Sequence, residues 1–261
     1  AGRGNVISGN AGHGIFVEQA SLSPMILGNY IGVGADGVTD LGNGGAGILG
    51  ATNSTGINIG SGAPNGLNVI SGNGAHGVQM ISGANFASIR GNYIGLAADG
   101  TTAVGNAADG VHINAATFAF IGDALANYGN VISANGEEGI HIMGASTGAN
   151  IRGNYIGTDA TGTLDRGNEY DGIYSTSTGA TIGSGAAGAM NVISGNGQAG
   201  ISLTNTGNSI LGNRIGTNAA GTAALGNGSD GISLGASTMV GGIGANEGNL
   251  ISGNTTSGIY G

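Results

Sequence analysis

One short pattern recurs through the whole of this 261-residue chain and leaves little room for an irregular globular fold. Its first half reads Asn, any residue, Ile, and its second half reads Asn, three residues, Gly, then Ile or Val. The first half is anchored at Asn5, Asn29, Asn68, Asn92, Asn130, Asn154, Asn191, Asn213 and Asn249. The second is anchored at Asn10, Asn43, Asn73, Asn106, Asn135, Asn168, Asn196, Asn227 and Asn254. Such a recurrence predicts a stack of repeated structural units.

The spacing of the repeats indicates a coil of strands. Successive second-half Gly residues lie 33, 30, 33, 29, 33, 28, 31 and 27 residues apart, so long and short units alternate. Each unit holds three short runs of period two between Gly/Asn turns, which is a strand pattern, and the frequent Gly argues against helices. We therefore expect an all-β parallel β-helix of about eight to nine coils, each with three short strands, stacked about 4.8 Å apart.

The repeats predict a single domain over residues 1–261, because a solenoid grows by adding neighbours and needs no central core. Its repeat blocks are about 5–67, 68–129, 130–190 and 191–248, followed by a partial block at 249–261. A four-bladed propeller with blades of about 61 residues is the alternative. Each such block contains the pattern twice, however, which favours the coil.

The repeated NVISGN, the stretch GNYIGTDATGT at Gly153 to Thr163 and the Gly-Ile strands resemble the right-handed parallel β-helix repeats of the pectin-lyase-like superfamily. The resemblance covers the whole chain and is closest to the Gly/Asn-rich form found in large secreted bacterial proteins. It implies a right-handed coil and an extracellular or cell-surface location. It leaves function open, because that superfamily includes lyases, hydrolases, epimerases, phage spikes and adhesins.

The two Asn columns predict structural ladders. Asn tolerates the left-handed backbone of sharp turns, and its amide can donate to one neighbouring coil and accept from the other. Stacked Asn residues form such ladders in other parallel assemblies. The Ile two residues after each first-half Asn is expected to point into the core.

The balance of charge excludes several partners. The chain has five Arg, no Lys and fourteen acidic residues, which gives a net charge of -9. Nucleic acids and anionic membranes need basic residues to neutralise phosphate, so neither is expected, and polyanions such as pectin or alginate are disfavoured. The chain has no Cys for thiolate chemistry and no apolar run long enough to cross a membrane.

One group of titratable residues stands out on the outward face of the Gly-Ile strands, along which pectin-lyase-like enzymes usually bind substrate. Three successive coils pair Asp109 with His112, Glu138 with His141, and Asp171 with Tyr174. Carboxylates beside His can perform acid/base catalysis or hold Ca²⁺. The alternative is a solvated face without chemistry. None of the five Arg falls in this column, where the family's lyases need a basic residue, and the sequence has neither the Arg-x-Lys of the family's hydrolases nor the Asp-Pro-His-Glu of its epimerases.

The long units carry four inserts, at 32–40, 95–103, 157–165 and 216–224. Asp159 and Asp165 in the third insert are weak candidates for Ca²⁺, the only cofactor the sequence suggests, as are Asp36 and Asp40 in the first; a solvated turn is the alternative. The residue after each first-half Asn, such as Tyr93 or Val131, either lies under these inserts or forms an apolar stripe for a partner or a glycan.

Together these features predict a non-enzymatic structural or adhesive β-solenoid of a secreted or surface assembly. The chain starts and stops inside the repeat, so stacking on itself, head to tail, is also expected. The alternative is a polysaccharide-active lyase, hydrolase or epimerase, or a glycan-binding module, that uses the outward face of the Gly-Ile strands.

Overall fold

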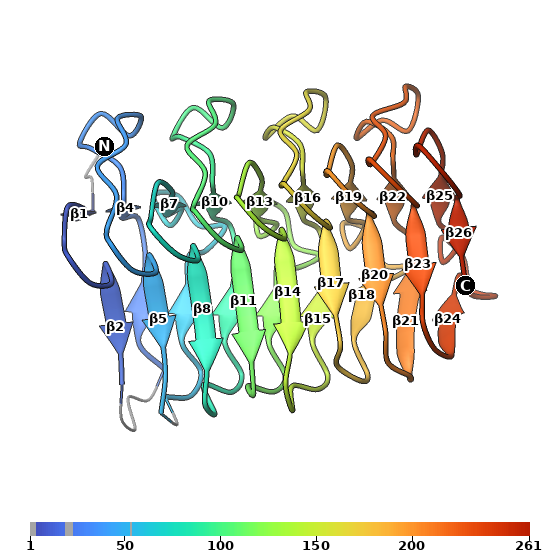
Figure 1. Ribbon diagram of the computed structural model, residues 1–261, viewed down its shortest axis with the longest axis horizontal. Helices are drawn as coiled ribbons and strands as arrows, with labels where there is room; N and C mark the ends of the chain where they lie inside the picture. The colour runs from blue at the N-terminus through green and yellow to red at the C-terminus, as the bar shows by residue number, and fades with distance from the viewer. Residues whose placement is uncertain (1–3, 19–22, 53) are drawn as a thin grey trace.

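The chain forms a right-handed parallel β-helix of about eight turns (Figure 1). The computed structural model describes residues 4–18, 23–52 and 54–261. Over these residues every pairing between named strands is parallel, and no helix occurs. Consequently no helix in the described part of the chain could span a membrane. The predicted all-β architecture is confirmed.

Three sheets run along the axis of the rod, one for each strand of a coil. The Asn-x-Ile sheet consists of β1 (Val6–Ile7), β4 (Tyr30–Ile31), β7 (Val69–Ile70), β10 (Tyr93–Ile94), β13 (Val131–Ile132), β16 (Tyr155–Ile156), β19 (Val192–Ile193), β22 (Arg214–Ile215) and β25 (Leu250–Ile251). The Gly-Ile sheet consists of β2 (Ile15–Val17), β5 (Ile48–Gly50), β8 (Val78–Ile81), β11 (Val111–Asn114), β14 (Ile140–Met143), β17 (Ile173–Ser175), β20 (Ile201–Leu203), β23 (Ile232–Leu234) and β26 (Ile259–Tyr260). The third sheet consists of β3 (Met25–Ile26), β6 (Asn58–Ile59), β9 (Ser88–Ile89), β12 (Phe120–Ile121), β15 (Asn150–Ile151), β18 (Thr181–Gly183), β21 (Asn208–Leu211) and β24 (Thr238–Val240).

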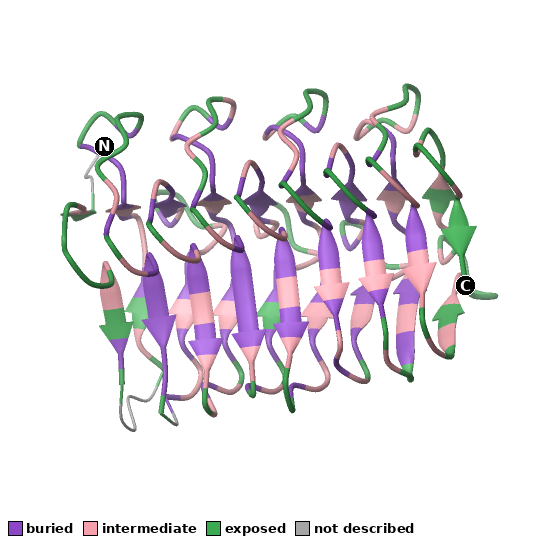
Figure 2. Ribbon diagram, in the orientation of Figure 1, coloured by how far each residue is buried: buried purple, intermediate pink, exposed green. Residues whose placement is uncertain are grey.

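The core is a set of aliphatic columns inside the coil. In the Asn-x-Ile sheet, Ile94 pairs with Ile70 on one side and Ile132 on the other, and all three are fully buried. The same register places Ile, Val or Leu columns on the inner faces of the other two sheets, so the interior is buried along most of the rod (Figure 2). Burial of each such side chain stabilises the fold by about 1.5–3 kcal/mol.

Both predicted Asn ladders are present and continuous. In the second-half ladder the side-chain amide of each Asn donates to Oδ1 of the Asn one coil on, as Asn106 does to Asn135 at 2.9 Å. The first-half ladder is formed in the same way, as from Asn92 to Asn130 at 3.0 Å. A second donor, the main-chain N–H of the same residue, reaches the same oxygen. The ladders therefore satisfy the polar groups of the turns between stacked coils.

The expected left-handed backbone of the ladder Asn residues is wrong. None of the ladder residues in the described chain has a positive φ. At alternate coils of each ladder the left-handed conformation belongs to the residue just before the Asn, for example Gly72 (φ 75°) before Asn73 or Ala134 (φ 61°) before Asn135. At those coils the preceding residue, usually Gly, takes up the left-handed geometry, and the Asn contributes its amide.

The four inserts form a row of loops on one side of the rod (Figure 1). Each loop closes with an antiparallel bridge, such as Thr158 with Asp165. Successive loops also touch, since the Ala98 N–H donates to the Gly37 carbonyl at 2.9 Å. Val69 and Val192, in the short coils between the long ones, are fully buried. These two members of the outward column are therefore buried, in agreement with the predicted cover by neighbouring loops.

Candidate functional site

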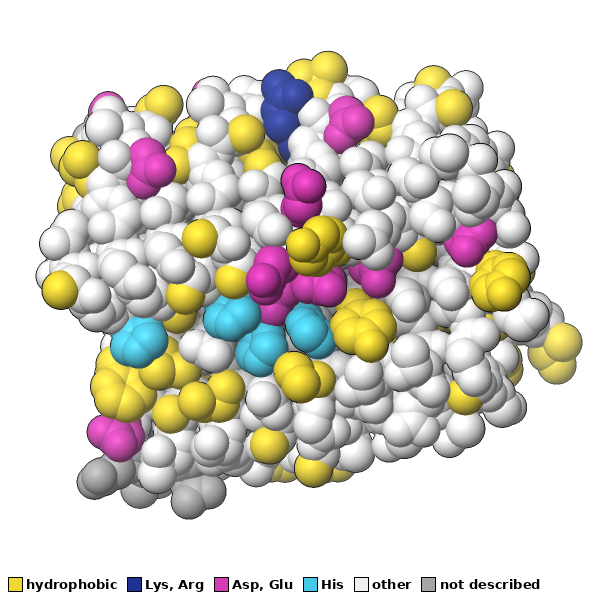
Figure 3. Space-filling model, in the orientation of Figure 1, with side chains coloured by type: hydrophobic (Ala, Val, Ile, Leu, Met, Phe, Trp, Pro, Cys, Tyr) yellow, Lys and Arg dark blue, Asp and Glu magenta, His cyan; other side chains and the backbone are white. Residues whose placement is uncertain are grey.

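The outward column of the Gly-Ile sheet has the predicted register. Gln79 of β8 pairs with His112 of β11, which pairs with His141 of β14, which pairs with Tyr174 of β17. Because these strands are parallel and in register, the four side chains lie in one row about 4.8 Å apart. The histidines and the acidic residues beside them gather at the centre of one face of the molecule (Figure 3).

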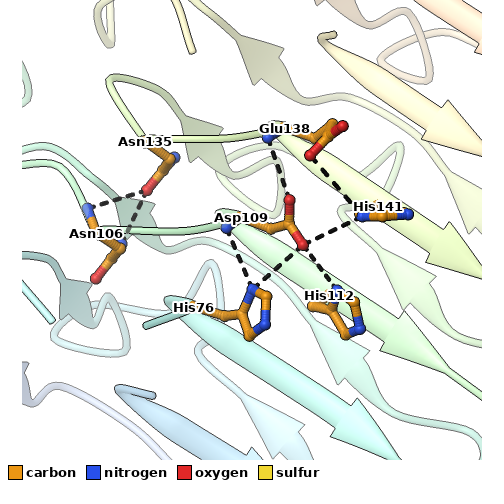
Figure 4. A network of polar contacts seen from close by, with 7 residues as sticks. All are labelled: His76, Asn106, Asp109, His112, Asn135, Glu138 and His141. Atoms are coloured by element: carbon orange, nitrogen blue, oxygen red, sulfur yellow. Dashed lines mark hydrogen bonds and ion pairs between the residues drawn. The ribbon is translucent and has the colours of Figure 1, made fainter. Parts of the chain in front are cut away.

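Asp109, just before β11, is the centre of this group (Figure 4). Its side chain is 1% exposed, and its Oδ2 lies 2.7 Å from Nδ1 of His112, 3.2 Å from Nδ1 of His76 and 3.4 Å from Nδ1 of His141. Its other oxygen, Oδ1, accepts the main-chain N–H of Glu138 at 3.2 Å. A buried carboxylate is thus held by three coils at once.

His76 completes the group, although the sequence pairing of Asp109 with His112 did not include it. Its Nδ1 accepts the main-chain N–H of Asp109 at 3.2 Å. His13 accepts the N–H of Ala46 in the same way at 3.0 Å, so the bond is a feature of the repeat. The signal for His76 was its place in the column of Asp109, one coil earlier. We call His76, Asp109, His112, Glu138 and His141 the histidine–carboxylate cluster.

The aromatic rings pack in a row along this face. His76 and His112 stack with centroids 4.3 Å apart, and His141 lies edge-on to His112 and to Tyr174, at 5.1 Å from each. The expected pairing of Glu138 with His141 is loose, at 3.8 Å. Asp171 is 8% exposed and accepts the Ala199 N–H at 2.8 Å. Asp171 and Tyr174 therefore flank the cluster, with Tyr174 in contact through its ring.

The groups of the histidine–carboxylate cluster shift one another's pKa values. Burial raises the pKa of Asp109, but the contacts with His112, His141 and His76 outweigh it and hold that pKa well below its usual range. Burial, reinforced by the neighbouring Asp109, raises the pKa of Glu138 to about 7. Burial lowers the pKa of His141, but the two carboxylates prevail and raise it overall. The arrangement favours positive charge around Asp109, which is what a bound cation would supply.

The calcium candidates of the third insert have partners within their own loop. Asp159 accepts the N–H groups of Thr163 and Leu164 at 2.8 and 2.9 Å, and Asp165 accepts that of Gly167 at 2.9 Å. Burial raises the pKa of Asp159, but these bonds lower it overall. Neither residue belongs to a group of three metal-ligating side chains in the described part of the chain. Calcium binding here stays a prediction.

A second surface feature is an exposed aromatic pair on the third-sheet side. Phe86 and Phe118 precede β9 and β12 by two residues and are 52% and 47% exposed, with nearly parallel rings whose centroids lie 5.4 Å apart. Both have a left-handed backbone, with φ 57° and 56°. Other coils place Gly at this point of the turn, at Gly56, Gly148, Gly179 and Gly207. Sequence reasoning missed this pair, which we call the Phe platform.

A groove of about 1020 Å³ lies over the outer side of the Asn-x-Ile sheet. Tyr93, Tyr155 and Arg214 line it, and its edges come from loops such as 123–129 and 184–190. These three residues belong to the predicted outward column. Val131, which lies between Tyr93 and Tyr155 in the column, also lines the groove, so the column is covered at Val69 and Val192 and opens into the groove at these four residues.

Comparison of the sequence with protein-family models and with curated proteins found no significant match.

Proposed function

We propose that the protein is a non-enzymatic β-solenoid that serves as a rigid adhesive element and binds neutral glycan chains at the Phe platform. The Phe platform itself is the observation on which this depends. All four Phe residues of the chain, Phe16, Phe86, Phe118 and Phe120, are exposed by 39% or more, while the core is built from aliphatic residues. These aromatic side chains do not contribute to the buried core.

The backbone strengthens this argument. A bulky residue with a positive φ costs on the order of 1–2 kcal/mol, and such strain gathers at functional sites. At Phe86 and Phe118 the chain accepts this cost in two successive coils at a position where Gly fits. A stabilising role in the core would not explain two exposed rings, whereas a ligand-binding role does.

A neutral glycan fits the chemistry around the rings. The C–H face of a sugar packs on aromatic carbon, while its hydroxyls need polar partners at the edge. Asn85 and Thr117 come just before the two Phe residues and carry an amide and a hydroxyl, which are bonded to each other through Oδ1 of Asn85. The net charge of -9 disfavours acidic polymers. The rod's resemblance to pectin-lyase-like β-helix proteins of the secreted bacterial type supports the same setting, outside the cell.

Affinity electrophoresis in gels containing a soluble neutral glucan or mannan tests the proposal. Wild-type protein should be retarded in at least one neutral gel and not in pectate or alginate. Phe86→Gly/Phe118→Gly should abolish the retardation, while its thermal midpoint stays at or above that of the wild type, because Gly relieves the left-handed strain. Phe16→Ala removes an exposed Phe outside the platform and serves as the matched control.

Two outcomes would contradict the proposal. Binding that survives the double Gly variant but is lost in Tyr155→Ala would place the ligand in the groove. Turnover of any of these polymers that disappears in His141→Ala would show an enzyme acting through the outward face of the Gly-Ile strands. The proposal predicts no turnover of any of these polymers. Head-to-tail association remains a separate prediction, to be measured by light scattering.

A further inference from the structure

We propose that His76, His112 and Asp109 form a binding site for one divalent transition-metal ion, with Zn²⁺ as the representative. Each of the three residues offers one ligand atom, an imidazole nitrogen or a carboxylate oxygen, and these atoms all lie within 4.8 Å of one another. Imidazole nitrogen with a carboxylate suits zinc and its neighbours in the first transition series, whereas Ca²⁺ and Mg²⁺ take oxygen ligands. This inference is independent of the proposed glycan binding.

The spacing of the ligand atoms fits such an ion. Two ligands that lie 2.0–2.1 Å from a tetrahedral metal are about 3.3 Å from each other. Oδ2 of Asp109 lies 3.2 Å from Nδ1 of His76 and 2.7 Å from Nδ1 of His112. Shifts of less than about 1 Å in these two contacts therefore bring them to the separation that zinc requires.

The contact between His76 and Asp109 needs positive charge between its two atoms, which either a proton on Nδ1 or a metal ion supplies. Nδ1 of His76 accepts the main-chain N–H of Asp109, so in that bond the nitrogen carries a lone pair and no proton. The same lone pair is 3.2 Å from a carboxylate oxygen, which is also an acceptor. His13, which makes the same main-chain bond, has Ala46 in place of the aspartate. His76 therefore differs from His13 in having a second acceptor in front of its lone pair, and a metal ion would join the two.

The fold fixes the positions of the three ligand residues. Asp109 and His112 are three residues apart at the start of β11, and His76 lies one coil earlier, where parallel pairing of β8 with β11 fixes its position. The carboxylate is pinned by the Glu138 N–H on its other oxygen. The imidazoles are 17% and 11% exposed, which lets an ion enter and leaves room for water as a further ligand.

His141 and Glu138 lie on the other side of the same carboxylate and offer the competing arrangement. With Asp109 they form a second group of three within 4.8 Å, at contacts of 3.4 and 3.8 Å. That group has one nitrogen and two oxygens, and its atoms are farther apart. The first group, with two nitrogens and shorter contacts, is the better transition-metal site.

Titration of tag-free protein with ZnCl₂ against a chromophoric chelator tests the assignment, with Co²⁺ absorption as a second readout. We expect one equivalent of tight binding. Asp109→Asn and His112→Ala should each weaken zinc binding by about 100-fold or more. Loss of a residue that only hydrogen-bonds to a metal ligand already reduces metal affinity by about 10–100-fold. His76→Ala should weaken it comparably, and each should change the Co²⁺ d–d spectrum. His13→Ala is the matched control and should bind as the wild type does.

Thermal melts in EDTA identify variants that fail to fold, and isosteric Asp109→Asn is the variant least prone to this. Three results would overturn the assignment. The first is no zinc binding by folded wild-type protein. The second is equal affinity in Asp109→Asn and His13→Ala. The third is loss of binding in His141→Ala or Glu138→Gln with His76→Ala unaffected, which would place the ion in the second group.

Discussion

At the scale of single residues, the ladder Asn combines three hydrogen-bonding functions in one side chain. Asn106 donates its amide to Asn135 one coil on and to the Ile70 carbonyl one coil back, and its own Oδ1 accepts from Asn73. Aspartate would lose the donors, and Gln is one methylene too long for the same register. The repeat therefore keeps this residue type at every coil, although the turn itself makes no demand on its backbone.

Asn135→Ala should lower the free energy of unfolding by about 1–3 kcal/mol, because it leaves buried amide and carbonyl partners without their bonds. Asn135 is 2% exposed, bonds to Asn168 at 2.9 Å and accepts from Asn106. Urea titration followed by circular dichroism measures the change. Gln198→Ala, on an exposed side chain, is the control and should be neutral. Equal midpoints for the two variants would show that the ladder contributes no stability.

The sequence predicted the residues of the candidate site only in part, for a physical reason. Asp109, His112, Glu138 and His141 share two adjacent columns, and columns can be read from the repeat. The convergence of three Nδ1 atoms on one oxygen depends on side-chain rotation, which the pattern does not encode. The positive φ of Phe86 and Phe118 could not be predicted from the sequence either, because Phe is not a residue type that indicates a left-handed turn.

At the scale of elements, the insert loops show how length variation is absorbed. The sequence located all four, because the ladder positions on either side stay in register. It did not predict that successive loops touch, because Gly37 and Ala98 lie two coils apart in the chain. The contact depends on small residues: a Cβ added at Gly37 would lie 2.7 Å from the Cβ of Ala98.

The third and fourth loops form a natural pair for a test of pH dependence. Asp159 and Asn218 occupy the same position, and each accepts N–H groups four and five residues on. The folded pKa of Asp159 lies below its ordinary value of 3.8, so its stabilisation is complete above that pH and is lost as the pH falls through the lowered value. Asp99 in the second loop, whose Oδ2 accepts the hydroxyl of Thr102, should follow the same course with a pKa of about 2.

Two-dimensional NMR in acid measures this directly. The amide of Thr163 should move as Asp159 is protonated, with a midpoint below pH 3.8, while the amide of Thr222, bonded to Asn218, should stay in place. Asp159→Asn should make the third loop behave like the fourth. A Thr222 amide that titrates with Thr163 would mean that the rod as a whole, and not the loop carboxylate, responds to acid.

At the scale of the whole molecule, each coil is stabilised mainly by the coils next to it. Ile132 is fully buried between Ile94 and Ile156, and Ile132→Ala should cost about 2–5 kcal/mol. Ile251, in the last strand of the same sheet, is only partly buried, so Ile251→Ala should cost clearly less. Chemical denaturation of both variants gives the comparison. Equal losses would argue against additive coil-to-coil stabilisation.

The two Asn ladders also give the rod a net dipole along its axis. In each of them the oxygens accept from the preceding coil, as Asn106 does from Asn73 and Asn130 does from Asn92, so the side-chain carbonyls all face the N-terminal end. Aligned amide dipoles add along an axis, as they do in an α-helix. The solenoid thus has a macrodipole with its negative pole toward the N-terminus, set by neutral side chains alone and independent of the formal charge it carries.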